Sequence, residues 1–127
     1  MDCRQAVYAS VGAYLRMRTL NILFVCSRNK WRSRTAEKIF KDHGHYNVKS
    51  AGTESSAQVR VTEQLLKWAD KIFVMEEKHK SRMLMDFEDI ANKKEIIVLG
   101  IEDEYKFMDP ELIEILKISV QPYLEHE

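Results

Sequence analysis

The chain has 127 residues, a length that suits one domain with a normal hydrophobic core and no disulfide or metal staples. Its residues are 45% hydrophobic and 31% charged, as in globular proteins, and no apolar run reaches the ~20 residues that span a membrane. The net charge of zero argues against general nucleic-acid binding. Because Cys3 and Cys26 are the only cysteines, a disulfide framework is excluded, and we expect a reducing, cytoplasmic location.

The charge is unevenly distributed along the sequence. Residues 16–41 contain eight Lys or Arg and one acidic residue, whereas residues 86–127 contain twelve Asp or Glu and four Lys. The basic part indicates a local site for an anionic ligand. A solvated basic face that is balanced by acidic residues elsewhere explains the same pattern.

Predicted strands and helices alternate from residue 20 onward, after an N-terminal extension of residues 1–19 to which we assign no role. Apolar runs predict strands at 20–25, 46–51, 72–75 and 96–99, and helical periodicity predicts helices at 33–43, 62–69, 77–87 and from 110 onward. This alternation predicts an α/β fold, a four-stranded parallel sheet between two layers of helices, formed by residues 20–127 as one domain.

Three polar residues follow the ends of predicted strands. Cys26 follows the first strand, Glu76 the third and Asp109 the fourth. Ligands of parallel sheets bind at the carboxyl ends of the strands, so we expect these side chains to share one rim. Three histidines, His43, His45 and His79, lack the spacing of metal ligands and are expected at the surface.

The residues CSRNKWRS, from Cys26 to Ser33, are suited to binding a phosphoryl group. A loop that leads into a helix offers backbone N–H donors and a positive dipole end to an anion. Arg32 can hold two phosphoryl oxygens with its planar guanidinium. Cys26, at the base of the loop, feels the same positive field and forms a nucleophilic thiolate near neutral pH. Ser33 can stabilise that thiolate, and Asn29 tolerates left-handed backbone.

Three motifs in order strengthen this interpretation, because a C-x5-R spacing alone also fits a buried cysteine and a surface arginine. The run VCSRNKWRS resembles the active-site loop V-C-x-x-N-x-x-R-S of the low-molecular-weight protein tyrosine phosphatases. Residues 50–53, SAGT, are similar to that family's S-A-G-T, and Asp109-Pro110 to its late D-P. The resemblance extends from about Leu20 to the C-terminus and implies a flavodoxin-like sheet with strand order 2-1-3-4.

The resemblance also implies an activity, that of a cysteine-dependent phosphomonoester hydrolase, a protein tyrosine phosphatase that needs no metal and no cofactor. Cys26 would form a phosphocysteine, Arg32 would stabilise the phosphoryl oxygens, and Asp109 would protonate the leaving oxygen and then activate water. The phosphate-binding loop would comprise Ser27, Arg28, Asn29, Lys30, Trp31 and Ser33, with Ser50 as a partner of Asn29. As a residue before Pro110, Asp109 fits a plain helix N-cap equally well.

The chain departs from the family pattern around the pocket. No aromatic residue follows Thr53, where the family carries one that walls the pocket; Trp31, Tyr105 or Phe107 could take that place. Lys30 occupies the position where family members differ between phosphotyrosine and phosphoarginine preference, and its charge should disfavour a guanidinium substrate.

Expected partners are a phosphorylated protein or a small phosphate ester, without nucleic acid or membrane. Two other protein classes that use a cysteine after the first strand are disfavoured. An arsenate reductase needs further cysteines, and this chain has none after Cys26. A phosphocarrier domain of sugar transport lacks the loop arginine, which is present here as Arg32. A non-catalytic module that binds phosphate or a phosphoprotein on the same fold is the alternative function.

Overall fold

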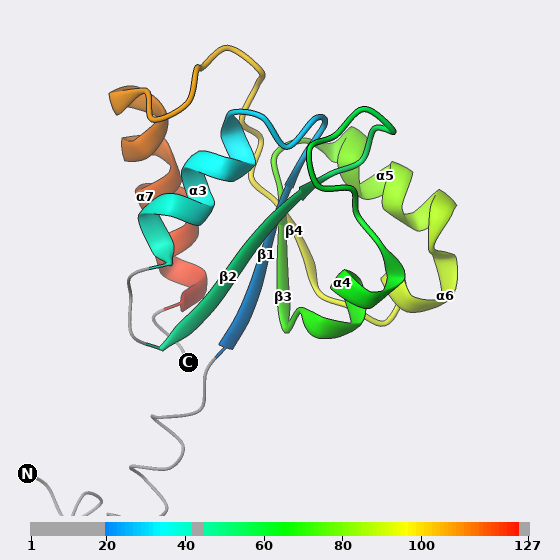
Figure 1. The fold of residues 1–127 in the computed structure, drawn as a ribbon. Helices are drawn as coiled ribbons and strands as arrows, with labels where there is room; N and C mark the ends of the chain where they lie inside the picture. Colours follow the sequence, from blue (N-terminus) through cyan, green and yellow to red (C-terminus); the bar gives the residue numbers. More distant parts are fainter. Residues whose placement is uncertain (1–19, 42–44, 125–127) are drawn as a thin grey trace, which may run out of the picture.

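A computed structural model describes residues 20–41 and 45–124 of the chain. Its centre is a four-stranded parallel sheet in the order β2-β1-β3-β4 (Figure 1). The strands are β1 (Leu20–Cys26), β2 (Tyr46–Gly52), β3 (Lys71–Val74) and β4 (Ile96–Val98). The helices are α3 (Arg32–Phe40), α4 (Glu63–Trp68), α5 (Glu77–Asp86), α6 (Glu88–Ala91) and α7 (Pro110–Leu124). The predicted strand order 2-1-3-4 is confirmed.

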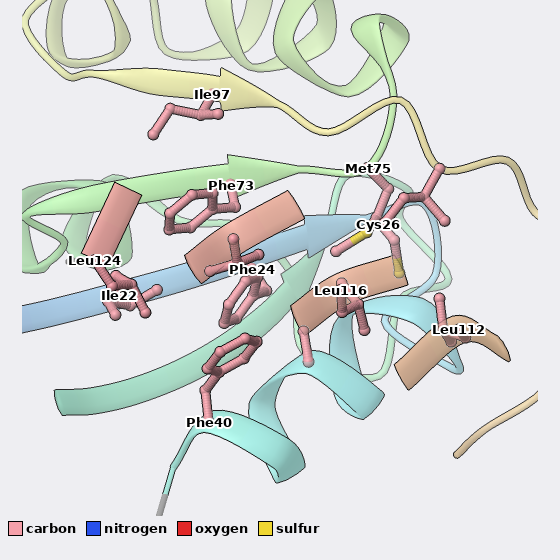
Figure 2. Close-up of a cluster of buried hydrophobic side chains, with 13 residues drawn as sticks. Ile22, Phe24, Cys26, Phe40, Phe73, Met75, Ile97, Leu112, Leu116 and Leu124 are labelled. Atoms are coloured by element: carbon pink, nitrogen blue, oxygen red, sulfur yellow. The ribbon is translucent and has the colours of Figure 1, made fainter. Parts of the chain in front are cut away.

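Helices cover both faces of the sheet, which confirms the three-layer arrangement. Helices α3 and α7 lie on one face, and α4, α5 and α6 lie on the other (Figure 1). Side chains of β1 alternate between the two faces of the sheet. Ile22 and Phe24 belong to the first core, which is shared with α3 and α7, whereas Leu23 and Val25 belong to the second core, on the opposite face. Figure 2 shows the first core, to which Cys26 at the end of β1 belongs together with Met75 and Leu112.

The helices begin where the sequence signals predict. Thr62 caps α4, since its Oγ1 accepts a hydrogen bond from the Leu65 amide at 3.2 Å. Asp109 precedes Pro110 at the start of α7, and its Oδ1 accepts from the Glu111 amide at 2.8 Å. Asparagine and aspartate at such positions satisfy amides that have no carbonyl partner inside the helix.

Two elements differ from the prediction. Helix α3 begins at Arg32 and ends at Phe40, and the predicted end at His43 falls among residues 42–44, outside the described residues, as do residues 1–19. The short helix α6 was not predicted. It follows α5 because Phe87 leaves the helical conformation, with φ −136° and ψ 48°, and the chain then makes one further turn. Among the described residues, none of the helices has the length and apolar character that a membrane span requires.

Candidate active site

Three carbonyl groups at the start of the loop between β1 and α3 are hydrogen-bonded to the segment after β2. The Cys26 carbonyl accepts a hydrogen bond from the Thr53 amide at 3.0 Å, and the Ser27 carbonyl accepts one from the Glu54 amide at 2.9 Å. The Arg28 carbonyl accepts one from the Gln58 amide at 3.0 Å. In the part of the chain that the structure describes, the amides of residues 27–31 donate no hydrogen bond to a backbone carbonyl. The loop therefore presents N–H donors at the N-terminus of α3, as an anion requires.

Asn29 holds this loop conformation together. Its φ of 56° lies in the left-handed region, as expected for this residue. Its side-chain amide donates to Ser33 Oγ at 2.9 Å and to Ser50 Oγ at 2.8 Å, so the predicted contact between Asn29 and Ser50 is present. Ser50 in turn donates to Glu37 Oε1 at 2.5 Å. The loop is thus connected to β2 and to α3 by buried hydrogen bonds.

The same network orients a hydroxyl group toward Cys26. Cys26 Sγ lies 3.0 Å from Ser33 Oγ, and the cysteine is 3% exposed. Because Ser33 Oγ already accepts from Asn29, its hydroxyl hydrogen is free to be donated to the sulfur. The hydroxyl donor therefore faces the sulfur from within the same network.

Arg32 is buried beneath the loop and tied to the opposite side of the site. Its Nη1 donates to Glu76 Oε1 at 2.6 Å and to the Ile101 carbonyl at 2.8 Å, and its Nε lies 3.7 Å from Asp103 Oδ1. Burial would raise the pKa of Glu76, but the hydrogen bond and the positive charge of Arg32 outweigh it and hold the pKa below its usual value. Glu76 therefore stays ionised and fixes the guanidinium.

His79 was expected at the surface, but it is buried, with 1% exposure. Its Nδ1 accepts from the Glu76 amide at 2.9 Å in the capping box that opens α5, so Nε2 carries the proton and donates to Ser27 Oγ at 2.9 Å. Burial, together with the charge of Arg32, lowers the pKa of His79 to about 4. The imidazole is neutral at pH 7 and holds Ser27 in the loop.

A pocket of about 280 Å³ opens above this loop. Its lining comes from the loop itself, from the segment after β2, from the start of α5 and from the segment after β4: Cys26, Ser27, Arg28, Lys30, Trp31, Arg32, Glu54, Lys78 and Asp103. Four of these residues are cations and two are carboxylates, so the pocket favours an anion. Among the described residues, no group of His, Cys, Asp and Glu is placed to hold a metal ion.

The predicted site residues do not all reach this pocket. Six residues of the phosphate-binding segment line it, whereas Asp109 lies at the start of α7 and is not part of the lining. Of the three candidate aromatics, Trp31 lines the pocket. Tyr105 packs against the first core, and Phe107 is 44% exposed beneath the guanidinium of Arg34. Trp31 is therefore the aromatic wall.

Sequence reasoning missed three residues of the site. Glu37 and His79 are recognised through contacts with Ser50 and Ser27, which are 13 and 52 residues away in the chain. Asp103 lies five residues after β4, in an acidic segment where no single carboxylate stands out. Asp103 could have been found from its place after the end of a strand, because the same position led us to expect Glu76 and Asp109 at the rim of the sheet.

Comparisons with known proteins agree with this geometry. Residues 21–69 match the model of the low molecular weight phosphotyrosine protein phosphatase family, which covers the region from β1 to α4. No curated protein sequence gives a match to the chain.

Solved structures with the same fold include several phosphatases. The YwlE arginine phosphatase from Geobacillus stearothermophilus is 20% identical, with a TM-score of 0.62 over 84% of this chain and 95% of that one. Vibrio vulnificus Wzb in complex with benzylphosphonate is 18% identical, with a TM-score of 0.69 over 85% and 99%. The low molecular weight protein tyrosine phosphatase from T. tengcongensis is 21% identical, with a TM-score of 0.67 over 86% and 100%.

At these identities the structural similarity establishes the fold, while the match over residues 21–69 comes from the sequence itself. That segment carries β1, the loop from Cys26 to Ser33, and the SAGT run at the end of β2. The family model, the strand order and the loop thus agree that residues 21–69 are similar to the low molecular weight phosphotyrosine protein phosphatases.

Proposed function

We propose that the protein is a cysteine-dependent phosphomonoester hydrolase that acts through a phosphocysteine intermediate. The observation that carries this proposal is the position of Cys26 at the base of a pocket whose lining includes Arg32 and the amide-presenting loop. A phosphoryl group in that pocket would have its oxygens bound by the loop amides and the guanidinium, with the sulfur directly beneath phosphorus.

The chemistry proceeds in two displacements. The Cys26 thiolate, stabilised by the Ser33 hydroxyl, forms a bond to phosphorus while the bond to the leaving oxygen breaks. A carboxyl group gives its proton to that oxygen, and the resulting carboxylate then takes a proton from water as the water oxygen attacks phosphorus. The sulfur–phosphorus bond breaks, and inorganic phosphate leaves the regenerated thiolate. Arg32 and the loop amides stabilise the equatorial oxygens in both displacements.

The pocket favours an aryl phosphate, such as phosphotyrosine in a protein, over phosphoarginine. Trp31 offers an aromatic face at the pocket, and Lys30 places its Nζ 4.8 Å from the centre of that ring. A phenyl ring can stack beside Trp31, whereas a substrate guanidinium would lie beside the cations Lys30, Arg28 and Lys78. The fold relative from Geobacillus is described as an arginine phosphatase, so the two substrate classes need a direct comparison.

The test is hydrolysis of p-nitrophenyl phosphate by the wild type and by Cys26→Ser, followed by release of phosphate from phosphotyrosine and phosphoarginine peptides. We expect Cys26-dependent turnover, with phosphotyrosine preferred by at least about tenfold, equivalent to ~1.4 kcal/mol. Vanadate binding without turnover in the wild type would instead identify a module that binds phosphorylated partners. Comparable rates on both peptides would refute the substrate preference alone.

A further inference from the structure

The segment between β4 and α7 contains two aspartates that differ in their relation to the pocket. We infer that Asp103, and not Asp109, is the general acid and base of the reaction. The inference rests on the proposed function and names the carboxyl group on which both displacements depend. It follows from three observations: the position of Asp103, the anchoring of its segment, and the hydrogen bonds that occupy Asp109.

Asp103 lines the pocket together with Cys26 and Arg32. Its Oδ1 lies 3.7 Å from Arg32 Nε, at the guanidinium that would hold the phosphoryl oxygens. The side chain is 59% exposed, so both a leaving group and a water molecule can reach it. A general acid must lie within hydrogen-bond reach of the leaving oxygen, and Asp103 stands in the same pocket, at the guanidinium that would hold the substrate.

The segment that carries Asp103 is fixed to the rest of the site. Two residues earlier, the Ile101 carbonyl accepts from Arg32 Nη1 at 2.8 Å, and the Ile101 amide donates to the Met75 carbonyl at 2.7 Å. These bonds connect the segment to β3 and to the guanidinium at the same time. Asp103 is therefore held near the phosphoryl site by the backbone contacts of its segment.

Asp109 is occupied elsewhere. Its Oδ1 accepts from the Glu111 amide at 2.8 Å, and its carbonyl accepts from the Ile113 amide at 3.0 Å, as an N-cap residue does. The preceding Met108 has φ 61° and donates its amide to Thr35 Oγ1 at 2.9 Å, which ties this turn to α3. Asp109 could reach the pocket only if this turn were remodelled and the cap of α7 were lost.

Charge in the pocket also suits the role of Asp103. A phosphoryl dianion brings its oxygens to Arg32 and competes with Asp103 for the guanidinium, so the carboxyl group is left beside a new negative charge. The first displacement needs a protonated carboxyl group at this place. After the leaving group departs with the proton, the carboxylate is ready to accept a proton from the attacking water.

The experiment compares Asp103→Asn, Asp109→Asn, Glu54→Gln and the neighbouring surface variant Glu104→Gln on a series of aryl phosphates with good and poor leaving groups. For Asp103→Asn we expect kcat to fall by about 10²–10³-fold on phenyl phosphate, but by much less on a dinitrophenyl phosphate that leaves without a proton. The fall of kcat at high pH, where the acid is deprotonated, should disappear in this variant. Asp109→Asn should not steepen the dependence on the leaving group, because asparagine caps a helix as well as aspartate does.

Two results would overturn the inference. The leaving-group signature in Asp109→Asn, or in Glu54→Gln at the other pocket carboxylate, would assign the acid to that residue while leaving the cysteine mechanism intact. The proposed function and the inference would both be overturned if Cys26→Ser turned over substrate as fast as the wild type, or if the wild type showed no turnover. Thermal unfolding of each variant shows whether a loss of rate reflects a loss of folded protein.

Discussion

Replacing Gly52 by alanine should displace the phosphate-binding loop. Gly52 ends β2 beside Cys26, and a Cβ atom added to it would lie 2.5 Å from the Ser27 carbonyl oxygen and 2.8 Å from the Asn29 amide nitrogen. Both contacts are with backbone, so no side-chain rotation relieves them. The loop must move by several tenths of an ångström or more, and overpacking of this kind costs about 1–3 kcal/mol.

The displacement should reach the chemistry, because Ser27 and Asn29 belong to the anion cradle. A shift of about 1 Å in a catalytic site can lower the rate ~10²-fold. The assay is urea unfolding together with kcat/KM for p-nitrophenyl phosphate and the affinity for vanadate. We expect Gly52→Ala to lower the free energy of unfolding by about 2 kcal/mol and to weaken vanadate binding at least about tenfold.

A core variant far from the loop provides the matched control. Val120 is fully buried in α7, and Val120→Ala removes two buried carbon atoms at a cost of about 2 kcal/mol. This variant should lose similar stability while retaining vanadate affinity. Wild-type stability and wild-type vanadate binding in Gly52→Ala would refute the reasoning, since the contacts leave no room for the added carbon.

Three further predictions concern pH, the pocket wall and the loop support. The buried His79 has a pKa of about 4 against 6.5 unfolded, so below pH 6.5 only the unfolded state takes the proton. The free energy of unfolding therefore has its full value above pH 6.5 and falls toward pH 4 by up to ~1.4 kcal/mol per pH unit. Urea unfolding between pH 7 and 5 should show this slope for the wild type and lack it for His79→Gln. Trp31→Ala should raise KM for aryl phosphates about tenfold, whereas Phe107→Ala should not; equal KM values in both variants would contradict Trp31 as the wall. Asn29→Ala should lower the free energy of unfolding by about 2–4 kcal/mol, measured in urea, because it loses two buried hydrogen bonds and retains φ 56°. Asn29→Gly relieves the backbone strain alone and should recover only part of the loss.

The architecture could be predicted from the sequence because its signals are local. The apolar run that forms β1 is buried on both faces, and the β-α alternation leaves few arrangements of a parallel sheet. The loop from Cys26 to Ser33 was also predictable, since its position between a strand and a helix follows from the same pattern. Asn29 has the left-handed φ that its residue type favours at such a turn.

The contacts that assemble the site could not be predicted in the same way. His79 reads as a polar residue on an amphipathic helix, and only the packing of α5 against the loop brings its ring to Ser27. Asp103 and Asp109 are the same type of residue, and the sequence pattern favoured Asp109 as the catalytic acid because a proline follows it. What separates them is tertiary: Arg32 holds the backbone near Asp103, and α7 begins directly at Pro110.

Trapping of the intermediate tests the central claim most directly. Wild-type protein is mixed with an aryl phosphate that has a good leaving group, quenched in acid within the first turnovers, digested, and analysed by mass spectrometry. The account predicts one phosphoryl group on the peptide that contains Cys26, with none in Cys26→Ala handled in parallel. A phosphoryl group on another residue, or turnover without any trapped phosphoprotein, would contradict attack by Cys26.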